Sequence, residues 1–156
     1  MKTCCGFGHR VVLENIEPEL SAAVRGAVLD GCGVFYTGAM GEFDALFSSA
    51  VRKVKAQHPH IRLICVKPYF SNDLNTRRDY YAAYYDDVII PPELAGVHYR
   101  AAIPLRNRWL VEHSDLIIGY LVRRDGGAFH AIQYAESCGK TIIPVTRSFF
   151  DVFNHI

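Results

Sequence analysis

Three glycine-bearing segments of this 156-residue chain carry the residue types from which proteins build anion sites. They are Gly6–Arg10, Thr37–Asp44 and Asp125–Ala128, and each follows an apolar run of the sequence. Glycine lets a ligand approach the backbone closely, and the first turn of a helix offers free N–H groups to a phosphate. The three segments together predict a pocket for a phosphate-bearing, nucleotide-like ligand.

The first segment contributes Gly8, His9 and Arg10, and the arginine can supply a charged fork to a phosphate. The segment lacks the G-x-G-x-x-G pattern, so dinucleotide binding by that mechanism is not indicated. An ordinary tight turn is an equally good interpretation of this segment taken by itself.

The second segment places Gly38 and Gly41 just before a strongly amphipathic pattern, which predicts an anion site at a helix N-terminus. Glu42 and Asp44 would repel a phosphate if they faced it. Asp44 could instead cap the helix or contact a sugar hydroxyl, and a simple cap and turn is the alternative to a ligand site.

The third segment, with Gly126 and Gly127, offers the same geometry beside Arg123 and Arg124. A fourth candidate is Arg106-Asn107-Arg108, inside an expected helix. Three successive polar residues cannot all face solvent on a packed helix, so we expect one to point toward the pocket or another subunit. A solvated turn is the alternative.

Other chemistries find little support. The seven histidines and five cysteines show no metal-ligand spacing, and neither a Walker loop nor a G-x-S-x-G elbow is present. We therefore expect no metal and no cofactor.

The formal net charge of +1 argues against a protein that coats nucleic acid, so we expect no nucleic-acid partner. No apolar run approaches the length of a membrane span, which predicts a cytoplasmic protein without a membrane partner.

The elements that must position these residues alternate along the chain. Strands are expected at 2–7, 33–37, 61–66, 87–90, 116–121 and 141–145, and helices at 14–30, 42–57, 75–85, 101–113 and 127–138. This alternation predicts one α/β domain over 1–156, a Rossmann-like three-layer α/β/α fold with a mostly parallel sheet. We expect the strand order 3-2-1-4-5-6, with the ligand at the carboxyl edge between the first and fourth strands.

Tyr80, Tyr81, Tyr84 and Tyr85 form an aromatic stripe at helical spacing. Core packing or a subunit interface is the first interpretation, and stacking on a base is the second. Together with the apolar tail 149–156, the stripe predicts a homo-oligomer.

The ordered set of motifs resembles the YpsA-like branch of the SLOG superfamily over nearly the whole chain. The motifs are Gly8-His9-Arg10, the run 38–44, the run 106–111 before Ser114-Asp115, and Gly126-Gly127 before Tyr134-Ala135. The resemblance implies a Rossmannoid fold related to the lonely-guy enzymes and to the DNA-processing protein DprA. It also implies a ligand pocket lined by Gly8, His9, Arg10, Gly38, Gly41, Asp44, Arg106, Asn107, Gly126 and Gly127.

The chain departs from the lonely-guy signature P-G-G-x-G-T-x-x-E, whose glutamate serves catalysis. The matching region, 125–133, lacks the proline, the later glycine, the threonine and the acid. Ala128 also stands where many YpsA-like sequences have threonine, so one hydroxyl contact is lost. These departures favour binding over catalysis.

Three functions remain open from the sequence. The first is a non-catalytic module that senses a nucleotide or nucleotide-derived ligand. The second is an enzyme that cleaves an N-glycosidic bond in a nucleotide, for which Glu42 and Asp44 would be the catalytic carboxylates. The third, ranked last because of the neutral net charge, is single-stranded nucleic-acid binding by analogy with DprA.

Overall fold

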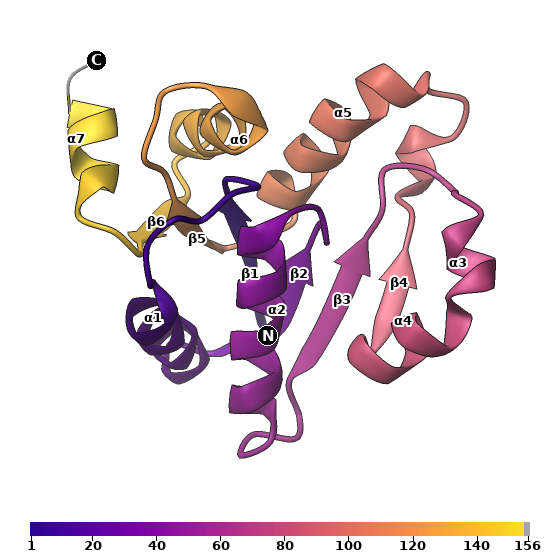
Figure 1. The fold of residues 1–156 in the computed structure, drawn as a ribbon, viewed down its shortest axis with the longest axis horizontal. Helices are drawn as coiled ribbons and strands as arrows, with labels where there is room; N and C mark the ends of the chain where they lie inside the picture. Colours follow the sequence, from indigo (N-terminus) through magenta and orange to yellow (C-terminus); the bar gives the residue numbers. More distant parts are fainter. Residues whose placement is uncertain (155–156) are drawn as a thin grey trace.

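The computed structural model describes residues 1–154 as alternating strands and helices (Figure 1). The strands are β1 (Lys2–Gly8), β2 (Cys32–Thr37), β3 (Arg62–Val66), β4 (Asp87–Ile89), β5 (Leu116–Tyr120) and β6 (Thr141–Pro144). The helices are α1 (Glu17–Leu29), α2 (Glu42–Lys55), α3 (Asp73–Thr76), α4 (Arg78–Tyr84), the 3₁₀ turn η1 (Pro92–Leu94), α5 (Tyr99–Glu112), α6 (Gly126–Ser137) and α7 (Ser148–Asn154).

The strands form one six-stranded, all-parallel sheet in the order β4-β3-β2-β1-β5-β6. The α/β class and the Rossmann-like layering are confirmed, but the expected order 3-2-1-4-5-6 is wrong for the fourth strand. That strand pairs with β3 at the outer edge, and β5 takes the expected place beside β1. The order therefore reverses between β1 and β5, where parallel sheets open a crevice at their carboxyl ends.

The fourth strand lies at the edge because its sequence does not suit the middle of a parallel sheet. β4 is three residues long, begins with the exposed Asp87 and is followed closely by Pro91 and Pro92. Central parallel strands are buried on both faces and strongly apolar, whereas charged and proline residues are typical of edges. From this edge the chain returns to β5 through α5, which runs back across the sheet in Figure 1.

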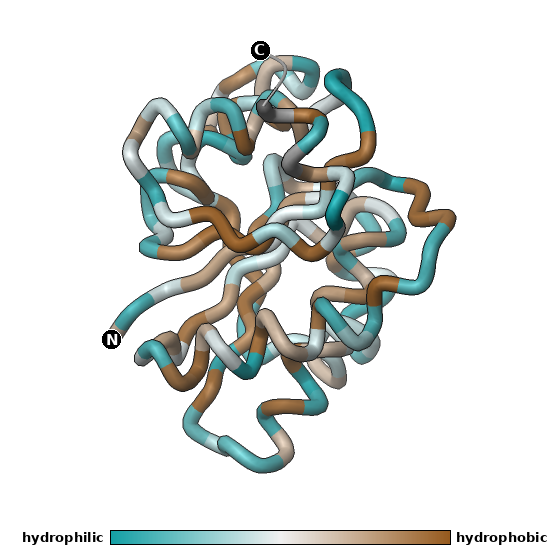
Figure 2. The backbone as a smooth tube through the Cα atoms, turned by 90° about the vertical axis from the view of Figure 1, so that its left-hand side faces the viewer, coloured by the Kyte–Doolittle hydropathy of each residue, from teal (hydrophilic) through white to brown (hydrophobic). Residues whose placement is uncertain are grey.

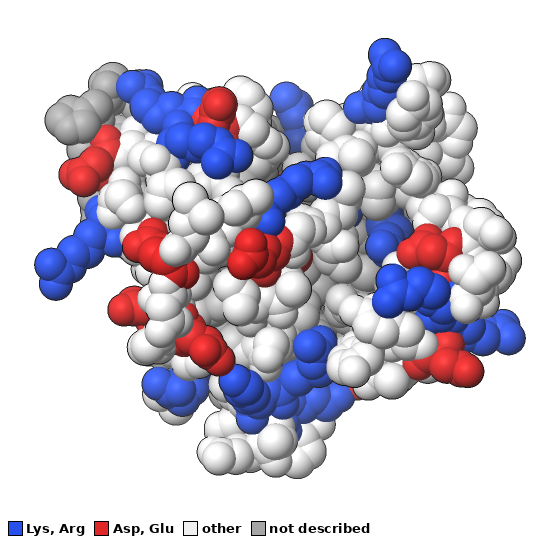
Figure 3. Space-filling view, in the orientation of Figure 1, with Lys and Arg blue, Asp and Glu red and all other residues white. Residues whose placement is uncertain are grey.

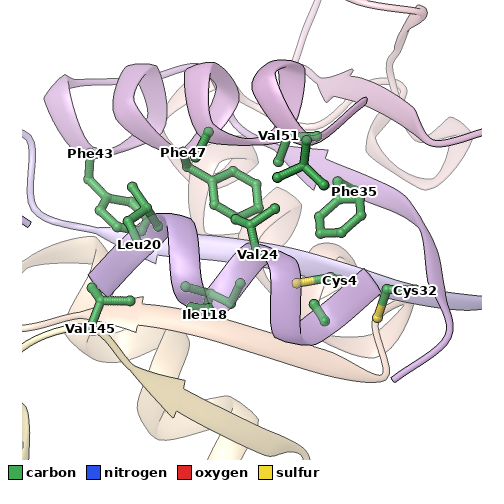
Figure 4. Packing of buried hydrophobic residues seen from close by; sticks show 14 of the residues in the cluster. Cys4, Leu20, Val24, Cys32, Phe35, Phe43, Phe47, Val51, Ile118 and Val145 are labelled. Carbon is green, nitrogen blue, oxygen red and sulfur yellow. The ribbon is translucent and has the colours of Figure 1, made fainter. Parts of the chain in front are cut away.

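Each face of the sheet is covered by its own apolar cluster, and the hydrophobic segments run through the middle of the molecule (Figure 2). On one face, α1 and α2 pack against the sheet and against each other. Figure 4 shows Phe43 and Phe47 of α2 pointing toward α1, with Phe43 at Leu20 and Phe47 at Val24. On the other face, α5, α6 and α7 cover the sheet, so the layers α/β/α are complete.

Several element boundaries differ from those expected. The predicted helix 75–85 is two short helices, α3 and α4, and α5 begins before the predicted residue 101. His98 caps α5, because its Nδ1 atom accepts the N–H of Arg100 at 3.2 Å. Pro104 therefore lies in the second turn of α5 and not in its first.

The predicted apolar tail, 149–156, forms α7 as far as Asn154, and its last two residues lie outside the described part of the chain. Phe149 and Val152 of α7 are buried against the cluster that covers the α5–α6 face. This burial accounts for much of the apolar surface that led us to expect an oligomer. None of the helices within 1–154 is long and apolar enough to cross a membrane.

Packing between β1 and α2 predicts a stability difference between two glycine substitutions. A Cβ atom at Gly8 would lie 2.2 Å from Cγ of Phe43, whereas one at Gly26 would meet nothing within 4 Å. Gly8→Ala should lower the free energy of unfolding by about 1–3 kcal/mol through overpacking. Gly26→Ala, in an exposed position of α1, should raise it by about 0.5–1 kcal/mol. Urea unfolding of both variants measures these changes. A Gly8→Ala variant with an unchanged free energy of unfolding would contradict the packing between β1 and α2.

Candidate functional site

A cavity of about 310 Å³ opens at the carboxyl edge of the sheet, between the ends of β1, β2 and β5. α5 forms one wall, and the start of α6 forms another. The lining residues are Gly6, Phe7, Gly8, His9, Arg10, Gly38, Met40, Asp44, Ile103, Arg106, Asn107, Leu110, Arg123, Gly126, Gly127 and Ala128.

The structure brings the predicted ligand residues together around this cavity, with one exception. Nine of the ten line it, and Gly41 does not, although its neighbour Met40 does. Glu42, the other carboxylate proposed for catalysis, is also absent from the lining. Its Oε1 atom accepts the N–H of Val12 at 3.1 Å, so Glu42 fixes the loop that follows β1.

Two backbone N–H groups at the start of α2 are bonded within the protein, as in the cap-and-turn alternative. The N–H of Met40 donates to Asp44 Oδ2 at 2.8 Å, and the N–H of Glu42 donates to the Arg10 carbonyl at 2.8 Å. Gly41 has φ 105°, and a Cβ atom there would lie 2.7 Å from Cα of Arg10. These glycine and acid positions therefore hold the β1 and β2 loops against each other.

Arg106 lies under the cavity and is only 3% exposed. Its Nη1 atom donates to the carbonyls of Val66 at 2.9 Å and Gly38 at 3.3 Å, and Nη2 contacts Met40 Sδ at 3.1 Å. The guanidinium also lies against Gly38, where a Cβ atom would be 3.1 Å from its Cζ atom. Because most of its donors are taken, Arg106 clamps the ends of β2 and β3 and sets a positive charge beneath the cavity floor.

His9 is buried, and its Nε2 atom accepts the N–H of Val122 at 3.0 Å. Its ring packs edge-on against Tyr120. Burial lowers the pKa of His9, and the nearby Arg123 lowers it further. A neutral His9 therefore ties the loop after β1 to the loop after β5, which is a positioning role.

The open side of the cavity is lined by Arg10, Arg123 and the first turn of α6. Both arginines are exposed, and Arg123 Nε pairs with Asp125 Oδ1 at 2.6 Å. Gly126 begins α6 with φ 90°, and a Cβ atom at Gly127 would have room, 3.7 Å from Asn107 Nδ2. The first N–H groups of a helix have no partner within the helix, so this side of the cavity can accept an anion.

Sequence reasoning left Arg123 and an apolar wall out of the site. Ile103 and Leu110 of α5 line the cavity with Arg106 and Asn107. The four positions follow the i, i+3, i+4, i+7 spacing of one helix face, so the periodicity of α5 contained the signal. Arg123 was recognisable by its place beside the glycine pair.

The comparisons with known proteins concern the fold. No family model matches the chain, and no curated protein matches it by sequence. Among solved structures, DNA processing protein A (DprA) from Streptococcus pneumoniae is similar with a TM-score of 0.67 at 15% identity, over 99% of this chain and 55% of that one. DprA from Helicobacter pylori, whose structure is described for its single-stranded DNA binding mode, is similar with a TM-score of 0.66 at 15% identity, over 92% of this chain and 64% of that one.

This chain thus spans between half and two thirds of the two DprA structures that it resembles. Their fold agrees with the Rossmann-like fold implied by the sequence motifs. They contradict the prediction of a nucleotide sensor and the expectation of no nucleic-acid partner. They favour instead the function that the sequence analysis ranked last.

The buried Asp44 predicts a pH dependence of stability. Burial raises its pKa from 3.8 to about 6, against the lowering effect of the Met40 N–H, Arg106 and Arg10. An acid with a raised folded pKa binds its proton more tightly when folded, so its contribution to stability falls as pH rises from about 4 through about 6.

Asp44→Asn removes this charge and keeps an acceptor for Met40. We compare the free energy of unfolding of the variant with that of the unsubstituted protein. This difference should shift in favour of the variant by about 1–3 kcal/mol when the pH is raised from 4 to 7. Urea titrations of both proteins at the two pH values measure the gain. An equal difference at both pH values would show that Asp44 is not held in a desolvated place.

Proposed function

We propose that the chain binds single-stranded nucleic acid, with a backbone phosphate in the cavity at the reversal point of the sheet. One observation carries the proposal: Arg10, Arg123 and the start of α6 all line that cavity. Phosphate contacts from arginine and from helix N-termini position a nucleic acid without reading its sequence. The likeness to DprA, one of whose structures is described for single-stranded DNA binding, supports this choice of ligand.

The neutral net charge does not oppose this function, because a few local charges suffice for a single strand. Figure 3 shows acidic and basic side chains interspersed over much of one face of the molecule, with several basic side chains gathered in its lower part. Each phosphate neutralised on a single strand contributes about 0.7 to the slope of log affinity against log salt. A site with few arginines should therefore show a shallow salt dependence.

The apolar wall of Ile103 and Leu110 suits the sugar or base of the same nucleotide. Single-strand binding sites combine charged groups for the backbone with apolar or aromatic surface for the bases. We further propose that residues 1–156 form one domain of the YpsA-like branch of the SLOG superfamily.

The test is binding of a fluorescently labelled (dT)20 strand, followed by anisotropy over a range of salt concentrations. Arg10→Ala and Arg123→Ala should each weaken binding, and each should reduce the salt slope by about 0.7 through the loss of one phosphate contact. Arg25→Ala is the matched control, because Arg25 is an exposed arginine of α1 outside the cavity lining.

A (dT)20 affinity that is undetectable at low salt would falsify the proposal. So would binding that Arg10→Ala and Arg123→Ala leave at the level of Arg25→Ala. A 20-base-pair duplex serves as the competitor, and it should displace the single strand poorly if the cavity accepts an unpaired nucleotide.

A further inference from the structure

A second hollow lies on the other side of the loop that joins β2 to α2. It has a volume of about 160 Å³. Its lining residues are Ala39, Gly41, Ala45, Ser48, Arg52, Arg77, Tyr80, Tyr81 and Tyr85. Gly38 and Met40 face the first cavity, whereas Ala39 and Gly41 face this one. The two hollows therefore share a wall that is one loop thick.

Three of the four tyrosines that the sequence had singled out line the second hollow, and the fourth, Tyr84, lies beside Tyr80. Tyr80 and Tyr84 are 40% and 45% exposed, and their ring centroids lie 4.8 Å apart. Tyr81 is buried, and its hydroxyl donates to Asp73 Oδ2 at 2.5 Å. Tyr81 thus anchors α4 to α3, while Tyr80 and Tyr84 offer aromatic surface to solvent.

Two arginines lie against these exposed rings. The Arg77 guanidinium carbon is 4.2 Å from the centroid of Tyr80, and that of Arg52 is 4.9 Å from the centroid of Tyr84. Arginines held on aromatic faces keep their outer N–H groups directed at water. Aromatic rings and arginines set side by side are the means by which proteins hold single-stranded nucleic acids, with bases on the rings and phosphates on the cations.

The lining of the hollow is partly polar. Ser48 is 1% exposed, and its hydroxyl lies beside the phenol of Tyr85. Burial raises the pKa of Tyr85 to about 12, while the Ser48 hydroxyl lowers it. The hollow therefore offers hydroxyl groups that can hydrogen-bond the polar edge of a nucleobase.

We propose that this hollow is a second nucleotide subsite, which stacks a base of the same strand on Tyr80 and holds its phosphate with Arg77 and Arg52. The proposal rests on single-strand binding at the first cavity. The strand would pass from Arg10 over the 38–41 loop into the second hollow. Arg77 and Tyr80 also line a third, shallower hollow over residues 75–80, so the path continues along the surface of α3 and α4.

Core packing explains Tyr81 but not Tyr80 and Tyr84, whose rings are nearly half exposed. Arg77 and Arg52 lie over these two rings, so the face is cationic as well as aromatic. A base and its phosphate suit both kinds of group. The chemistry of the hollow therefore favours a nucleotide over a subunit interface.

The first test measures (dT)20 affinity of Tyr80→Ala and Arg77→Ala. Tyr80→Ala should weaken binding at least about fivefold through the loss of stacking on one base. Tyr80→Phe should keep the affinity, because stacking uses the ring face and not the hydroxyl. Tyr99→Ala is the matched control, since Tyr99 is also an exposed tyrosine with an arginine, Arg100, 5.8 Å over its ring.

The second test places the base directly. A single strand in which 5-iododeoxyuridine replaces several thymidines is irradiated in complex with the full chain, and the crosslinked peptide is identified by mass spectrometry. We expect a crosslink at Tyr80 or Tyr84 and none at Tyr99.

The outcomes separate this inference from the function on which it rests. If (dT)20 does not bind the unsubstituted protein, both are overturned. If it binds and depends on Arg10, but Tyr80→Ala and Arg77→Ala behave like Tyr99→Ala, only the second subsite is overturned. A crosslink confined to residues of the first cavity would likewise overturn the second subsite alone.

Discussion

The buried guanidinium of Arg106 is the interaction on which the site depends. It reaches from α5, the helix that brings the chain back across the sheet, to the carbonyls at the ends of β2 and β3. A buried cation is costly to desolvate, and the carbonyl dipoles and the nearby Asp44 charge offset that cost only in this arrangement. The clamp therefore fixes the loop 38–41, which is the shared wall of the two hollows.

The acid and glycine positions that first suggested a phosphate site also hold the loops around the cavity in place. Asp44 binds the backbone of its own loop, Glu42 binds the loop after β1, and Gly41 permits the two loops to touch. The exposed cations that line the cavity are Arg10 and Arg123, and Arg123 also pairs with Asp125. The buried polar side chains thus hold the loops around the cavity in place, and the exposed arginines are the groups that can contact a ligand.

Much of this architecture could be predicted from local pattern. Apolar runs and helical periodicity located the strands and the long helices, and the parallel sheet brought nine of the ten predicted residues to one cavity. The pairing of β4 could not be read from periodicity, which does not encode neighbours in a sheet, although Asp87 and Pro91 indicated an edge. Which arginine is buried was open only as long as the face of α5 was not considered: Arg106 shares the i, i+3, i+7 face of Ile103 and Leu110, whereas Arg108 does not.

Net charge misled the functional prediction because it sums the charges of the whole chain, whereas a single strand contacts only the side chains along its binding path. Arg10 and Arg123 at the first cavity and two further arginines at the second lie on either side of one loop. Acidic residues elsewhere lower the total charge, whereas at the first cavity Asp125 pairs with Arg123 alone of its two exposed arginines. Exposed charges further apart than about 10 Å are largely screened at ordinary salt concentrations. The local arrangement of arginine, glycine and tyrosine therefore says more about the ligand than the sum of the charges does.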